Sequence, residues 1–144
     1  MRRTPFKGKT WVRKPQNAHR KKKPLSLRKV LDKLFSLFIR QRGASSEGLQ
    51  SCYTCGLVKH WKQLQCGHFV PRQYLAVRYD ETNCQPQCYA CNILYNGQPS
   101  AFAIRLEKDY GVGTVARLEA RRLEITKDFP YEEKITHYNS LISS

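Results

Sequence analysis

Two CxxC pairs constrain the fold of this chain more than any other feature of its sequence. Cys52 and Cys55 form the first pair, and Cys88 and Cys91 form the second. Four thiolates are the ligand set of tetrahedral Zn²⁺ in closed, structural sites. The stretch between the pairs is longer than in a simple zinc ribbon, so we expect folded structure within it. The sequence therefore predicts a structural zinc that ties two distant segments together.

The six cysteines can also be interpreted as three disulfides of a small secreted protein. The paired spacing, and the lack of an apolar signal segment near the N-terminus, favour a reducing compartment and a metal instead. Cys66 and Cys84 lie outside the pairs. We expect them to be small buried residues. The alternative is that one of them replaces another cysteine as a zinc ligand.

Positive charge is concentrated near the N-terminus. Residues 1–42 hold fifteen Lys and Arg against one acid, Asp32, a net charge of +14. The rest of the chain holds eleven against ten, which completes the total of +15. A basic block on a nearly neutral body is typical of proteins that bind polyanions such as nucleic acid. The alternative is a solvated tail that only aids solubility.

Residues 1–24 are expected to form a basic, flexible arm, followed by a zinc-bound domain over residues 25–144. The arm is interrupted by prolines and has too few apolar residues to offset the entropy of ordering. We expect its densest basic cluster to contact nucleic acid; this cluster is Arg20, Lys21, Lys22 and Lys23. No apolar run approaches the length of a membrane helix, so no membrane partner is expected.

The hydrophobic pattern predicts an α+β fold that is mainly helical, with flanking helices around a small zinc-stapled ββα core. A wide apolar face at helical period predicts a helix over residues 25–42, with Ser26 as its N-cap. Residues 74–79 fit either a strand or a short helical turn. Further helices are expected from near Cys88 to residue 97, over 99–109, over 115–127 after a Thr114 cap, and from Pro130 onward.

The stretch 66–92 carries residue types suited to cutting a phosphodiester bond. A neutral histidine, here His68, can act as the general base that activates water. Amide and carboxylate oxygens suit Mg²⁺, which needs few protein ligands. Asn92 is expected one helical turn before Asn96, on the same face. Structural roles stay open beside these: a structural or zinc-site histidine at 68, a turn residue at Asn83 and a surface amide at Asn92.

The order of these residues resembles a known superfamily. His68, Asn83 and the CxxC pair followed directly by Asn92, with a second CxxC upstream, are similar to the HNH (ββα-metal) nucleases. More narrowly, CGHFVPR, RYDETN, QCYACN and the downstream DYG resemble the phage NinG/Rap recombination nucleases. The resemblance implies a metal-dependent, structure-selective endonuclease that cuts branched DNA such as D-loops and Holliday junctions, in the cytoplasm of a bacterial host.

The resemblance also implies a role for each residue of the pattern. His68 would be the general base, Asn83 would orient the loop that carries it, and Asn92 would bind a catalytic Mg²⁺ or Mn²⁺. Zinc would stay structural. Many HNH enzymes have an Asp metal ligand directly before the base, but Gly67 occupies that position here. The carboxylate would then come from elsewhere, with Asp80 as the candidate, or the metal would have fewer protein ligands.

Arg72 and Arg78 are candidates for phosphate binding, because a guanidinium pairs well with phosphate oxygens. Either can equally be solvated. Two symmetric cuts in a four-way junction would favour a homodimer. The alternative function is a noncatalytic zinc-binding adaptor for DNA or RNA, which would need neither His68 nor Asn92.

Overall fold

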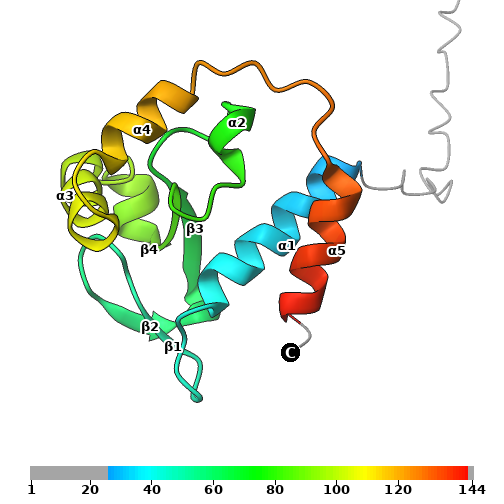
Figure 1. The fold of residues 1–144 in the computed structure, drawn as a ribbon. Coiled ribbons are helices and arrows are strands. Elements are labelled where there is room, and N and C mark those ends of the chain that lie inside the picture. Colours follow the sequence, from blue (N-terminus) through cyan, green and yellow to red (C-terminus); the bar gives the residue numbers. More distant parts are fainter. Residues whose placement is uncertain (1–25, 143–144) are drawn as a thin grey trace, which may run out of the picture.

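The computed structural model describes residues 26–142, which form an α+β fold (Figure 1). About half of these residues are helical, and the strands form two small antiparallel sheets. Helices α1 and α5 lie on one side of the central strands, and α3 and α4 lie on the other. Within the described range, no helix is long and apolar enough to cross a membrane.

Helix α1 (Leu27–Gln41) forms where the apolar pattern predicts it. Leu31, Phe35 and Ile39 recur every four residues and are buried, because this spacing places them on one face. Ser26 occupies the N-cap position, but its side chain makes no capping hydrogen bond. The helix is therefore stabilised mainly by its buried face.

Helix α5 (Tyr131–Ile142) begins directly after Pro130, as expected, and packs along α1. The ring of Tyr138 meets that of Phe35 edge to face, with centroids 5.1 Å apart. The Tyr138 hydroxyl also donates to the Glu81 carboxylate at 3.1 Å. The C-terminal helix thereby closes the core that α1 shares with the central strands.

The central hairpin pairs β3 (Leu64–His68) with β4 (Cys84–Cys88). Its register places Leu64 opposite Cys88, Cys66 opposite Pro86 and His68 opposite Cys84. Because side chains alternate along a strand, these six residues share one face of the hairpin. The other face carries the remaining four residues of the pair, namely Gln65, Gly67, Gln85 and Gln87.

The smaller sheet pairs β1 (Leu49–Ser51) with β2 (Val58–His60), and the short turn η1 (Trp61–Gln63) leads from it into β3. The first CxxC pair lies in the turn between β1 and β2. Gly56 in this turn has φ +74°, a conformation that favours glycine. The small sheet thus carries one half of the sulfur cluster to the hairpin.

The helix expected from Cys88 differs from the observed one. Cys88 is the last residue of β4, and the helical turn that follows, η2 (Ala90–Leu94), is of the π type. Asn96 adopts φ +51° and lies beyond the turn, so Asn92 and Asn96 do not share a helical face, and that prediction is wrong. The order strand, strand, helical turn is nevertheless present.

The stretch 74–79 contains a short helical turn, α2 (Leu75–Arg78), and α3 (Pro99–Tyr110) forms close to its predicted range. Helix α4 (Thr114–Arg121) is shorter than predicted. Leu123 and Ile125 are 77% and 87% exposed, so no apolar contact extends the helix beyond Arg121.

The start of α4 is also held differently from the prediction. Thr114 is its first residue, and the Thr114 hydroxyl donates to the Gly111 carbonyl at 2.7 Å. The capping carboxylate comes from Glu107 of α3, which accepts from the backbone N–H groups of Gly113 and Val115. Glu107 of the neighbouring helix α3 therefore caps α4, whereas the sequence predicted that the Thr114 hydroxyl would do so.

Candidate active site and metal centre

The two CxxC pairs come together as the spacing predicts. The sulfur atoms of Cys52, Cys55, Cys88 and Cys91 all lie within 4.8 Å of one another. The Cys55 and Cys88 sulfurs are 3.8 Å apart, too far for a disulfide at about 2.0 Å. A tetrahedral site with Zn–S bonds of about 2.3 Å separates its sulfurs by about 3.8 Å. The donor set and its geometry therefore fit a structural zinc.

Backbone groups support this cluster. The Cys88 N–H donates to the Cys52 sulfur at 3.3 Å, and the Gly56 N–H donates to the Cys52 carbonyl at 2.9 Å. Burial works to raise the pKa of Cys52, but hydrogen bonds from the backbone of Cys55 and Cys88 outweigh it and lower that pKa to about 6. One of the four sulfurs is thus largely a thiolate at neutral pH, which is the form that binds metal.

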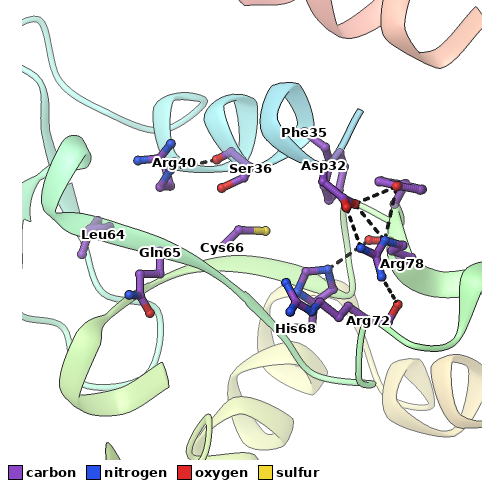
Figure 2. A pocket seen from close by; sticks show the side chains of 11 residues that line it. Asp32, Phe35, Ser36, Arg40, Leu64, Gln65, Cys66, His68, Arg72 and Arg78 are labelled. Atoms are coloured by element: carbon purple, nitrogen blue, oxygen red, sulfur yellow. Dashed lines mark hydrogen bonds and ion pairs between the residues drawn. The ribbon is translucent and has the colours of Figure 1, made fainter. Parts of the chain in front are cut away.

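A cavity of about 310 Å³ lies between α1 and the hairpin (Figure 2). Helix α1 contributes Asp32, Phe35, Ser36 and Arg40, and β3 contributes all its residues except Gly67. The segment after β3 adds three more lining residues, Arg72, Arg78 and Tyr79.

His68 stands at the end of β3 and faces this cavity. Its Nε2 lies 3.1 Å from the Arg78 carbonyl oxygen. A carbonyl can only accept, so this contact indicates that Nε2 carries the proton and leaves Nδ1 with the lone pair. Burial, aided by the charges of Arg78 and Arg72, lowers the pKa of His68. The ring is therefore neutral at pH 7, the form that a base requires.

Asn83 is fully buried and ties together the loop that follows His68. Its Oδ1 accepts from the Val70 N–H at 2.7 Å, and its Nδ2 donates to the carbonyls of Val70 and Val77 at 2.9 and 3.0 Å. These three hydrogen bonds hold the segment between β3 and α2 in contact with the residue just before β4. Asn83 thus makes the contacts that a loop-orienting residue needs.

Arg78 is buried and is bound within the protein. Its Nε and Nη2 donate to the two carboxylate oxygens of Asp32 at 2.8 and 2.7 Å, and its Nη1 donates to the Arg72 carbonyl. The Tyr79 hydroxyl also donates to Asp32, at 2.7 Å. Burial opposes the charge on Asp32, but hydrogen bonds from Arg78 and Tyr79 lower its pKa overall. Arg78 therefore fastens the loop to α1 and leaves no free N–H fork for a phosphate.

Two other arginines at the cavity have no carboxylate partner among residues 26–142. Arg72 is exposed at the rim. Arg40 donates to the Ser36 carbonyl at 3.0 Å, and its guanidinium lies 5.5 Å from the centre of the Trp61 ring. Arg40 was not among the predicted site residues, and its place on the basic side of this helix was the signal that could have singled it out. The predicted phosphate cluster Arg20–Lys23 lies outside the described residues.

Asn92 lies on the other face of the hairpin from His68. Its Nδ2 donates to Gln65 Oε1 at 2.7 Å, and Gln65 and His68 point to opposite faces of β3. Asn92 does not line the cavity that His68 lines. The structure thus brings His68 and Asn83 to one site and places Asn92 behind it.

Asp80 is occupied by contacts of its own. Its Oδ1 accepts from the Thr82 N–H at 2.8 Å and the Asn83 N–H at 3.3 Å, and its Oδ2 pairs with Arg121. It lines a different cavity from His68. Asp80, the candidate to replace the aspartate that many HNH enzymes have before the base, is therefore bound to other groups, away from His68.

Side-chain packing explains why the residue before His68 is a glycine. A Cβ at Gly67 would lie 2.0 Å from Gln87 Oε1, which is closer than side-chain atoms can approach. Gln87 is fully buried, and its Nε2 donates to Thr54 and to the Gly97 carbonyl. The Gln87 side chain thus fills the space that an aspartate at position 67 would need.

Comparison with known protein families matches residues 2–140 to a family described as bacteriophage lambda NinG protein. No match was found among curated proteins or among solved structures. The match spans nearly the whole chain, including the hairpin, both CxxC pairs and the cavity. The chain therefore belongs to the bacteriophage lambda NinG family.

Proposed function

We propose that this protein is an HNH-type endonuclease that cuts branched DNA during recombination, in the cytoplasm of a bacterial host. The observation that carries the proposal is the setting of His68. Its ring is held neutral at a cavity with two arginines, Arg40 and Arg72, that have no carboxylate partner in the described part of the chain, and its loop is closed by Asn83. A noncatalytic adaptor has no need for a neutral histidine held in this way.

In the proposed reaction, the chain's own residues activate the water and bind the phosphate. The Arg78 carbonyl holds the Nε2 proton of His68, so Nδ1 takes a proton from the attacking water. Arg72 and Arg40 bind oxygens of the DNA phosphate through their guanidinium groups. Asp32 keeps Arg78, and with it the carbonyl, in place. A positioned base of this kind contributes roughly 10²–10⁴-fold in rate.

Two metals have different roles in this proposal. Zinc at the four cysteines is structural, because four thiolates leave no open position for substrate. A catalytic Mg²⁺ or Mn²⁺ would neutralise charge on the phosphate and the leaving oxygen. Asn92, the ligand that the family resemblance implies, lies on the other face of the hairpin from His68, with its amide bonded to Gln65. We therefore expect tight Mg²⁺ binding only when DNA phosphates complete the site.

Exposed apolar side chains support a branched substrate. Tyr89, Ile93, Leu94 and Tyr95 lie in or beside η2, and each is about half exposed or more. Apolar and aromatic side chains at a DNA interface stack on, or insert between, unstacked bases. A branch point supplies such bases, whereas an intact duplex does not. Paired cuts at a junction would need two copies of the chain, so we also propose a homodimer on DNA.

His68→Ala tests the proposal directly. In a nicking time course on a four-way junction with Mg²⁺, cleavage should fall by roughly 10²–10⁴-fold while DNA affinity is retained. The matched control is His137→Ala, since His137 is exposed on α5 and does not line the cavity. Full activity in His68→Ala would refute the mechanism. A wild-type protein that binds branched DNA but cuts none of it, with Mg²⁺ or Mn²⁺, would be the adaptor instead.

A further inference from the structure

A second group of metal-ligand atoms lies at the far end of the hairpin from the CxxC cluster. Cys66 and His68 are alternate residues of β3, and Cys84 lies directly opposite His68 in β4, so all three share one face. One donor atom from each lies within 4.8 Å of the other two. Cys84 and the zinc ligand Cys88 are four positions apart in β4, about 13 Å of extended chain. The group is thus a separate cluster.

The donor set matches a known kind of zinc site. Two thiolates and one imidazole, with a fourth position left to water, form open zinc sites in proteins. Zn–S bonds of about 2.3 Å and Zn–N bonds of about 2.0 Å place tetrahedral donors roughly 3.3–3.8 Å apart. Donor atoms that already lie within 4.8 Å of one another need to approach by at most about 1–1.5 Å to meet this geometry.

The surroundings leave room for an ion and for its fourth ligand. Cys66 and His68 both line the 310 Å³ cavity, and Figure 2 shows them along β3 beneath α1. The Arg78 carbonyl lies 3.1 Å from His68 Nε2 and 3.5 Å from the Cys84 sulfur. It accepts the protons that these two groups carry. Zn²⁺ with two thiolates has no net charge, so it adds nothing to the repulsion from Arg40 and Arg72.

We propose that Cys66, His68 and Cys84 form a second zinc site, open to the cavity and distinct from the structural zinc. Binding displaces one proton from each thiol to the buffer, and His68 binds through a nitrogen that carries no proton. The Arg78 carbonyl then loses its hydrogen bond from Cys84, because the thiol has given up its proton.

This site has a consequence that rests on the proposed nuclease function. The imidazole that binds zinc no longer has a lone pair for water. Zinc at this site therefore switches off the base while the structural zinc stays in place, and Mg²⁺, which prefers oxygen ligands, does not. Zinc and magnesium have opposite effects on cleavage for this reason.

Zinc stoichiometry tests the site without any assay of activity. Full-length protein, reduced with a phosphine that binds zinc weakly, is titrated with Zn²⁺ against a chromophoric chelator. Wild type should bind two equivalents, and Cys66→Ser and Cys84→Ala should each bind one. Ser36→Ala is the matched control, because Ser36 lines the same cavity without a thiol or imidazole and should keep two. Co²⁺ should report two thiolates in its second equivalent by sulfur-to-metal charge-transfer absorption.

Three outcomes would overturn the second site. These outcomes are saturation of the wild type at one equivalent, two equivalents in both cysteine variants, and a second Co²⁺ without thiolate absorption. Circular dichroism of each variant shows whether it is folded. If Cys84→Ala does not fold, because Cys84 is fully buried, then Cys66→Ser and His68→Ala decide the result.

Inhibition is measured in a separate experiment. The cleavage rate with zinc added beyond the first equivalent is divided by the rate of protein that holds one equivalent only. For wild type in Mg²⁺ this ratio should fall by about 10²–10⁴-fold at saturation, the range for a lost general base. For Cys66→Ser at the same zinc concentration it should stay near one. Equal inhibition of both proteins would refute the link to His68. A wild type that never cuts would refute the nuclease proposal and leave the stoichiometry result standing.

Discussion

The two ends of the β3–β4 hairpin carry similar donor atoms and differ in what surrounds them. At the Leu64–Cys88 end, four thiols from two segments converge, and three of the four are buried. At the His68–Cys84 end, two thiols and an imidazole lie together, and the Cys66 thiol and the imidazole line a cavity that also holds cationic side chains. A closed set of four ligands can only hold structure, whereas an open set of three leaves a position for chemistry. Ligand count and access, rather than residue type, separate the two roles.

The largest effect should follow from breaking the closed end. Cys88→Ala removes one thiolate from the four, and binding in such sites is typically worth about 10–16 kcal/mol, more than the net stability of most small domains. The variant should lose zinc and unfold, as measured by metal content and circular dichroism. Cys84→Ala is the matched change at the open end and should keep the structural zinc. A folded, metal-free Cys88→Ala protein would contradict the structural role.

Asn83→Ala should damage the open end alone. It leaves the Val70 N–H and the Val70 carbonyl without their partner in a buried place, whereas the Val77 carbonyl keeps the Asp80 N–H as a donor. Each group left unpaired costs about 1–3 kcal/mol. We expect about 3 kcal/mol of destabilisation in urea unfolding, with zinc content unchanged. Loss of zinc in this variant would show that the two ends are not independent. Thr82→Ala, next to it in the chain, serves as the control.

Asp32→Asn tests the tie between α1 and the loop. Removing the charge leaves Arg78 buried without its counterion, which costs about 3–5 kcal/mol for a fully buried pair. The Asp32 side chain is 34% exposed, so solvent screens the pair and we expect about 2 kcal/mol. Urea unfolding measures the change, and cleavage should fall as well because the Arg78 carbonyl moves. Asp109→Asn, which breaks a surface pair on α3, should change stability by less than about 0.5 kcal/mol.

The smallest effect should come from Arg72→Ala at the rim. Loss of one phosphate contact lowers the salt dependence of DNA binding by about 0.9 in log–log slope. Binding titrations over a range of salt concentrations measure that slope, and stability should not change because Arg72 is exposed. Arg117→Ala removes an exposed arginine of α4 that bonds to the Thr114 hydroxyl and does not line the cavity, and it is the matched control. Equal slopes for wild type and Arg72→Ala would remove Arg72 from the DNA contact surface.

Local spacing in the sequence was enough for several elements. The four-residue recurrence of Leu31, Phe35 and Ile39 predicted α1, because one helical face needs only near neighbours in the chain. The CxxC spacing likewise predicted the cluster, since zinc coordination restricts four thiols to one small volume. Helix ends were predicted less well, as at Arg121, because they depend on contacts with other elements.

The sequence by itself determined which groups are available: four paired thiols, one histidine and two asparagines in a set order, and a basic N-terminal block. Only the tertiary structure decided which of them meet. The strand register put His68 beside Cys84 and away from Asn92, and the pairing of Asp32 with Arg78 joins residues 46 positions apart. Such contacts have no local period, since they depend on register and packing between distant segments. The side chain of Gln87 excludes an aspartate at position 67 for the same reason.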